Sequence, residues 1–196
     1  HQVIEQQWGH GLIRSWQERW LDLPVKLGRK IAQLIGASPE EVLVADSTSV
    51  NLFKLALATM QAIPERNTII TDDLNFPSDI YVLQSTTNLV GNDSHLEILQ
   101  SSDGASVLLS QLDQTIAGDT ALVSLCHTAF KSGFTYDLPA VSLMANQRGS
   151  WTLWDVSHSV GVIPLDLAQT KADLAVGCTY KFLNGGPGSP AFLYIS

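Results

Sequence analysis

Two polar segments of the chain carry residue types that could do chemistry together. Asp155 lies in the apolar run 151–156, and Lys181 follows a second apolar run, 172–179. If both runs are strands of one open α/β sheet, their carboxyl ends meet at the edge where such sheets bind ligands. Pyridoxal phosphate (PLP) enzymes need this pair, because a lysine forms a Schiff base with the cofactor aldehyde while a carboxylate keeps the pyridine nitrogen protonated. We therefore interpret Lys181 and Asp155 as a candidate PLP site.

Two further segments could supply the rest of such a site. The run Asp46-Ser47-Thr48-Ser49 lies between a short apolar run and a helical pattern, so its hydroxyl and N–H groups could bind a phosphate at a positive helix end. Phe76 precedes another helical pattern, where its ring could stack on the pyridine, and Asp79 follows one turn later. Taken alone, the first segment is an ordinary helix N-cap and Phe76 an ordinary core residue.

Other chemistries fit these residues less well. The glycine-rich run near the C-terminal end lacks the GK[ST] ending of a nucleotide-binding loop, and its prolines suit a turn between strands. Asp155, Ser157 and His158 are too close in sequence to form a hydrolase triad, and no GxSxG motif is present. Cys126 and Cys178 are too far apart for a CxxC site, so we predict neither a metal site nor a disulfide framework.

The elements that must position these residues follow from the hydrophobic pattern. Predicted strands cover 42–45, 69–71, 121–127, 151–156, 172–179 and 190–195, and predicted helices cover 49–62, 76–86 and 138–147. Two packing helices, 3–22 and 25–34, precede them, and 38–41 has the composition of a further helix start. Strands that alternate with helices predict an α/β fold, a three-layer αβα domain with a mostly parallel sheet.

Composition limits the classes of partner. The chain of 196 residues is 45% hydrophobic and 15% charged, which is typical of a folded globular protein. A net charge of -8 without a dense Lys/Arg block argues against nucleic acid, and no apolar stretch is long enough for a membrane helix. We therefore expect a cytoplasmic protein that acts on a small molecule.

Four segments together resemble kynureninase, a fold-type I, class V aminotransferase-like PLP enzyme: 46–53, 76–79, 154–159 and 177–192. The last is the most specific, because Tyr180-Lys181 is followed by the run Leu183-Asn184-Gly185-Gly186-Pro187-Gly188-Ser189-Pro190-Ala191-Phe192. The resemblance spans nearly the whole chain. It implies hydrolytic Cβ–Cγ cleavage of L-kynurenine, or 3-hydroxykynurenine, to anthranilate, or 3-hydroxyanthranilate, and L-alanine, in tryptophan catabolism and NAD biosynthesis.

The resemblance also implies roles for single residues. Lys181 forms the Schiff base with the cofactor, Asp155 pairs with the pyridine nitrogen, and Tyr180 lines the cofactor. As a mechanistic hypothesis, Lys181 shuttles a proton and Tyr180 is the candidate acid. Cys126 stands where the family commonly has a serine or threonine that touches PLP, so a hydroxyl is missing there. The other implied cofactor contacts are His158, Thr48 and Ser49, and the loop residues Phe76, Pro77, Ser78 and Asp79.

Kynureninases continue with a smaller C-terminal domain that carries the arginine for the substrate carboxylate. Residues 1–196, with N-terminal helices in 1–36, are accordingly expected to form the PLP-binding large domain without that small domain, and the family implies a homodimer. Two alternatives stay open. The first is another class V PLP enzyme, a cysteine desulfurase or an aminotransferase. The second is a catalytically silent fragment that holds PLP poorly or binds a partner chain.

Overall fold

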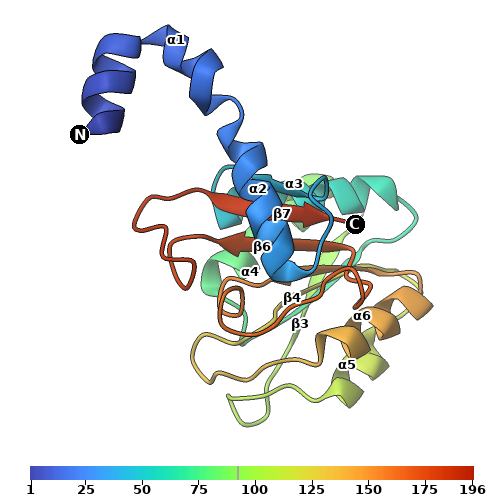
Figure 1. The fold of residues 1–196 in the computed structure, drawn as a ribbon. Coiled ribbons are helices and arrows are strands. Elements are labelled where there is room, and N and C mark those ends of the chain that lie inside the picture. Colours follow the sequence, from blue (N-terminus) through green and yellow to red (C-terminus); the bar gives the residue numbers. More distant parts are fainter. Residues whose placement is uncertain (92) are drawn as a thin grey trace.

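The core of the fold is one mixed sheet. The structure is a computed structural model that describes residues 1–91 and 93–196, and in those residues seven strands lie in the order β1-β7-β6-β5-β4-β2-β3 (Figure 1). Neighbouring strands from β6 to β3 pair in parallel, whereas β7 is antiparallel to both β6 and β1. The strands are β1 (Val42–Val44), β2 (Thr68–Asp72), β3 (His95–Leu99), β4 (Thr120–Cys126), β5 (Trp151–Asp155), β6 (Leu174–Cys178) and β7 (Ala191–Ile195).

Helices cover both faces of this sheet. On one face, α3 (Thr48–Ala62) and α4 (Pro77–Val90) pack leucines such as Leu52 and Leu83 onto Ile69 and Leu153. On the other face, α2 (Leu23–Ile35), α5 (Leu109–Thr115) and α6 (Leu138–Gln147) share a second cluster, which includes the fully buried Trp154. A sheet buried on both faces needs mostly apolar side chains on both sides of each central strand, and all seven residues of β4 are buried. The predicted three-layer αβα fold is confirmed.

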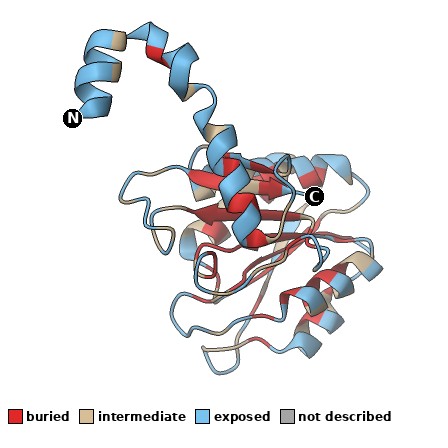
Figure 2. Ribbon diagram, in the orientation of Figure 1, coloured by how far each residue is buried: buried red, intermediate tan, exposed pale blue. Residues whose placement is uncertain are grey.

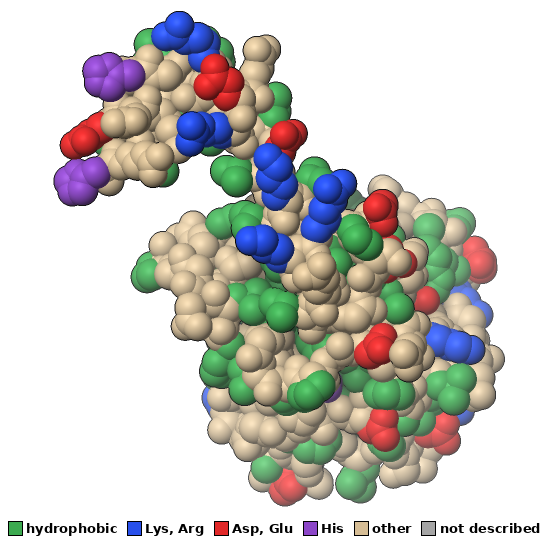
Figure 3. All heavy atoms as spheres, viewed as in Figure 1, with side chains coloured by type: hydrophobic (Ala, Val, Ile, Leu, Met, Phe, Trp, Pro, Cys, Tyr) green, Lys and Arg blue, Asp and Glu red, His purple; other side chains and the backbone are tan. Residues whose placement is uncertain are grey.

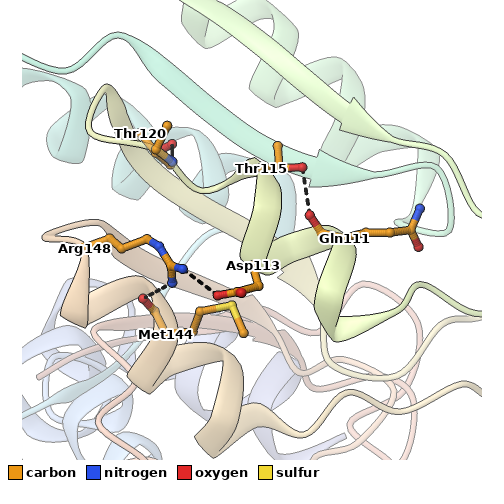
Figure 4. Close-up of polar contacts among 7 residues, drawn as sticks. Gln111, Asp113, Thr115, Thr120, Met144 and Arg148 are labelled. Atoms are coloured by element: carbon orange, nitrogen blue, oxygen red, sulfur yellow. Dashed lines mark hydrogen bonds and ion pairs between the residues drawn. The ribbon is translucent and has the colours of Figure 1, made fainter.

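A group of polar contacts, which we call the polar clasp, joins α5 to the C-terminal end of α6. It lies far from the strand ends that carry the candidate site. The Arg148 guanidinium forms an ion pair with Asp113, and its Nη1 also donates to the carbonyl of Met144 at 3.3 Å (Figure 4). Thr115 donates its hydroxyl to the carbonyl of Gln111 at 2.8 Å within α5 (Figure 4). The clasp fixes the two helices against each other on one face of the sheet.

The first 20 residues form an arm that stands away from the sheet (Figures 1 and 3). The arm consists of η1 (Gln2–Gly11) and η2 (Trp16–Trp20), two π-helical segments, and the short α1 (Ile13–Ser15) between them. Leu12, with φ 49°, breaks the single helix that we predicted over 3–22. Ser15 is the arm's buried residue, so the segment 3–22, which we expected to be a packing helix, does not pack on the core of this chain (Figure 2).

Other sequence predictions had mixed outcomes. The helix 138–147 and the six strands are confirmed to within a few residues. Residues 38–41 form a turn instead of a helix start, because Ser38 N donates to Glu41 at 2.7 Å and the chain enters β1 immediately. The strand β3 and the helix α5 were not predicted. Among the described residues, no helix combines the length and the apolar character needed to cross a bilayer.

Candidate active site

A cavity of about 130 Å³ lies at the carboxyl-end edge of the sheet. The end of β5, the starts of α3 and α4, and the turn between β6 and β7 surround it, as expected for the ligand-binding edge of an open α/β sheet. Most of the predicted site residues line it: Thr48, Ser49, Phe76, Ser78, Asp79, Asp155, Tyr180 and Lys181. Residues more than 130 positions apart in the sequence therefore share one small space.

The Lys181 amine is the central group of the cavity wall. Its Nζ lies 2.7 Å from Nε2 of His158, 5.5 Å from the centre of the Phe76 ring and 5.7 Å from the centre of the Tyr180 ring. Burial lowers the pKa of His158, and the positive charge of Lys181 lowers it further. His158 is therefore neutral near pH 7 and offers a nitrogen lone pair to the lysine.

Two carboxyl groups face each other at the buried end of the cavity. Asp155 and Asp79 are only 4% and 2% exposed, and Oδ1 of Asp155 accepts the backbone N–H of Ser157 at 2.8 Å. Burial raises the pKa of Asp79 to about 8, with the negative charge of Asp155 as the second cause. Among the residues that the structure describes, Oδ2 of Asp79 has no hydrogen-bond partner. Because a buried carboxyl oxygen without a donor is costly, this end fits a cationic N–H group such as a protonated pyridine nitrogen.

The opposite end of the cavity is formed by the start of α3. Ser47 caps this helix, since its hydroxyl oxygen accepts the backbone N–H of Val50 at 3.3 Å. The side chains of Thr48 and Ser49 lie next to it on the cavity wall. Asp46 instead pairs with Lys54 at 2.5 Å, outside the residues that line the cavity. The helix start therefore offers hydroxyl groups at its positive end, which fits a phosphate.

The turn between β6 and β7 holds Lys181 in place. Gly185 N donates to the carbonyl of Thr179 at 2.8 Å, and the Thr179 hydroxyl donates to that of Ser189 at the same distance. Sequence reasoning assigned no role to three residues that line the cavity, Ser157, Ser189 and Ala191, whereas Ser47 belongs to the run that we expected to bind a phosphate. Ser189 and Ala191 lie in the glycine-rich motif, so the sequence offered a signal for them. Their place in the cavity wall depends on β7 turning back beside β6.

Three predicted cofactor contacts lie outside the cavity wall. Pro77 is the first residue of α4, where its ring fits because that position needs no N–H donor. His158 reaches the site through its contact with Lys181. Cys126 lies behind His158, with Sγ 3.8 Å from its Nδ1, and burial raises the pKa of the Cys126 thiol well above its ordinary value. The Cys126 thiol is therefore protonated and withdrawn from the cavity.

The fold and the site together define a class of protein. A family model described as "Aminotransferase class-V" matches residues 24–195, so the chain belongs to the class V aminotransferase family. Two solved structures show the same fold. One is a C-DES mutant with glycine covalently linked to its PLP cofactor (TM-score 0.79, 18% identity, covering 94% of this chain and 48% of that one). The other is an apo cysteine desulfurase from Thermococcus onnurineus NA1 (TM-score 0.73, 24% identity, covering 88% of this chain and 42% of that one).

Sequence similarity is higher to one activity within this class. The chain is 42% identical over 199 residues to the kynureninase of Pseudomonas fluorescens, covering 99% of this chain and 46% of that protein. It is 40% identical to the kynureninase of Burkholderia mallei (strain SAVP1), with the same coverage. The chain thus spans just under half the length of the curated relatives it matches.

Proposed function

We propose that this chain is the PLP-binding part of an enzyme that hydrolyses L-kynurenine, or its 3-hydroxy form, to the corresponding anthranilate and L-alanine. The observation that carries the proposal is the cavity in which Lys181 meets the buried pair Asp79 and Asp155. The similarity to kynureninases over 99% of the chain supports the choice of substrate.

The proposed cofactor orientation follows from the two ends of the cavity. Thr48 and Ser49 would bind the phosphate at the start of α3, Asp155 and Asp79 would hold the pyridine N–H, and Phe76 would pack against the ring. When bound, PLP supplies an electron sink for the negative charge that develops on the substrate. Asp155 keeps that sink effective, because a carboxylate at the ring nitrogen favours its protonated form.

Two side chains are suited to moving protons. Lys181, once its amine is free, takes the α-proton of the substrate, a role typically worth about 10²–10⁴-fold in rate. Tyr180 is half exposed at the cavity, and burial is the main cause of a raised pKa for its phenol. Its phenol therefore keeps its proton at neutral pH and can donate it near the substrate carbonyl.

The first test is a PLP titration followed by borohydride reduction and peptide mapping. We expect the label on Lys181, and its loss in Lys181→Ala. Lys131→Ala is a matched control, because Lys131 also lies 5.5 Å from an aromatic ring, that of Phe130, but outside the residues that line the cavity. The natural protein that carries residues 1–196 should then release fluorescent anthranilate from kynurenine. Labelling that is scattered and unchanged in Lys181→Ala would refute the proposed site.

A cysteine desulfurase is the second candidate function, because one of the solved structures with this fold is such an enzyme. It is less well supported, since both thiols are buried at 2% exposure and neither lies on the cavity wall. The test compares sulfide release from cysteine with anthranilate release from kynurenine, in the wild type and in Cys126→Ala and Cys178→Ala. Sulfide release that is the faster of the two and persists in both variants would favour a class V chemistry other than kynurenine hydrolysis.

Two further expectations remain proposals. The first is a homodimer in the cytoplasm, which size-exclusion chromatography with light scattering tests. The second concerns the polypeptide 1–196 alone, which we propose binds PLP less tightly than the natural protein. Equal PLP affinities would mean that residues 1–196 hold every important cofactor contact.

A further inference from the structure

The segment that follows β4 folds into a hairpin beside the cavity. Thr128 and Thr135 form an isolated antiparallel bridge, and Ala129 N donates to the carbonyl of Phe134 at 2.8 Å. At the hairpin's end, the buried Tyr136 donates its hydroxyl to Asp72 at the end of β2. The hairpin is thus hydrogen-bonded both to itself and to the sheet.

Two side chains contact His158 from different directions, Phe130 of the hairpin and Cys126 at the end of β4. The Phe130 ring stacks on the imidazole, with centroids 6.4 Å apart and planes at 25°, and its edge meets Phe76 at 5.1 Å and 70°. The Cys126 sulfur lies 3.8 Å from Nδ1 of His158. Phe130 therefore fixes the plane of the imidazole, and Cys126 touches the nitrogen that faces away from Lys181.

The hydrogen bonds around the thiol define its role. The Cys126 S–H donates to the carbonyl of Thr128 at 3.2 Å, which leaves the sulfur lone pairs free to accept. A lysine ammonium can only donate, so Nε2 of His158 must carry the lone pair and Nδ1 the proton. The Nδ1–H then points at the Cys126 sulfur. The Nδ1–H tautomer of His158 therefore satisfies all three contacts that link Lys181, His158, Cys126 and Thr128.

We propose that Cys126 and Phe130 are positioning residues that hold His158 with its Nε2 lone pair toward Lys181, so that the imidazole takes the proton that Lys181 must lose before its amine can bond to the PLP aldehyde. The proposal rests on the proposed function. In this step the proton crosses the 2.7 Å from Nζ to Nε2; the ammonium becomes a neutral amine and the imidazole becomes imidazolium. The Nδ1–H contact to sulfur is unchanged.

The surroundings of His158 act on this transfer in opposite directions: burial and the Lys181 ammonium oppose it, and the Asp155 carboxylate favours it. The imidazole faces the ammonium of Lys181 and the carboxylate of Asp155, beside the protonated thiol of Cys126. Burial and Lys181 lower the pKa of His158, whereas Asp155 raises it and so favours the imidazolium once the lysine proton has arrived. His158 is therefore a neutral acceptor in the resting site, with a carboxylate nearby to stabilise its charged form.

The test uses the natural protein freed of PLP and labelled with ¹⁵N-histidine. The histidine spectrum reports which ring nitrogen carries the proton, and the signal of His158 is identified by its absence in His158→Gln. We expect Nδ1–H in the wild type and in Cys126→Ser, and a mixture of tautomers in Cys126→Ala and Phe130→Leu. Phe134→Leu is the matched control, because Phe134 lies in the same hairpin and packs on Tyr136 instead of His158.

The second readout is the rate of PLP capture between pH 6 and 9, followed by absorbance. At pH 7 we expect capture to be about three- to tenfold slower in Cys126→Ala and Phe130→Leu, the factor for losing one ordinary hydrogen bond, and to recover at higher pH as the amine deprotonates unaided. The proposal would be overturned if Cys126→Ala and Phe130→Leu both kept the wild-type tautomer and the wild-type rate of PLP capture. If Cys126→Ala does not fold, loss of Nδ1–H in Cys126→Ser would overturn it. A wild type that captures no PLP would instead contradict the proposed function, while the tautomer still tests the positioning.

Discussion

The carboxyl of Asp79 makes the stability of the protein without PLP depend on pH. Burial, and then the charge of Asp155, raise its pKa in the folded state to about 8, against about 3.9 in an unfolded chain. Between these two values the folded state binds more protons than the unfolded state. The free energy of unfolding therefore falls as the pH rises through this range, by about 1.4 kcal/mol per pH unit, and levels off above pH 8.

Asp79→Asn removes this titration while nearly preserving the shape of the side chain. From pH 6 to pH 8 we expect the wild type to lose about 2–3 kcal/mol of unfolding free energy more than the variant does. The measurement is urea unfolding of the PLP-free protein, followed by circular dichroism at constant ionic strength. The variant should be more stable than the wild type at pH 8, where the buried pair would otherwise carry two negative charges.

Asp103→Asn provides the control of opposite sign. Asp103 is exposed, and hydrogen bonds from the backbone N–H groups of Ser106 and Ala105 lower its pKa. A lowered carboxyl pKa adds stability above the acid range, and this stability is lost only as the pH falls below about 4. Its substitution should therefore shift stability equally at pH 6 and pH 8. If wild type and Asp79→Asn show parallel pH profiles in this window, Asp79 does not hold a proton there, and our account of the carboxyl pair fails.

Three further substitutions test separate parts of the structure. Thr48→Ala should raise the PLP dissociation constant about 10- to 100-fold, the loss of one hydrogen bond to a charged group; an unchanged constant would move the phosphate away from α3. Tyr136→Phe should lower the free energy of unfolding by roughly 1–3 kcal/mol, measured with urea, because Asp72 loses a buried donor. Gly177→Ala should lower the free energy of unfolding by about 1–3 kcal/mol, because the added Cβ would lie 2.5 Å from the Phe192 ring. The measurement is the midpoint of thermal unfolding, and an unchanged midpoint would mean that the ring moves aside freely.

The parallel core of the fold was predictable from the sequence because its central strands are largely apolar. The five residues of β6 carry no polar side chain other than a thiol, and only Thr120 and Ser124 carry hydroxyl groups in β4. The edge strand β3 was not predicted, since His95 and Glu97 are exposed and alternate with less exposed residues. An edge strand has one face in water and therefore lacks the continuous apolar signal.

The candidate site was predictable where one strand end carries one functional residue, as at Asp155 and Lys181. Which of the site residues interact with each other was not predictable. That Asp79 faces Asp155 depends on how α4 leaves the end of β2, which no local pattern encodes. Likewise, Phe130 was missed because its contact with His158 requires the hairpin to fold back over the strand ends. Sequence reasoning finds the residues at strand ends, and the turns decide which of them meet.

The strand β7 has a consequence for the order in which the protein assembles. Asp155 and Lys181 lie at the ends of neighbouring parallel strands close in sequence, whereas the hydroxyls at the start of α3 follow β1, whose partner in the sheet is β7. In that pairing Val42 lies opposite Tyr194, near the other end of the chain. Closing such a distant contact is slow compared with forming local ones. The cavity is therefore completed late in folding, and the appearance of PLP absorbance during refolding should time the closure of the whole sheet.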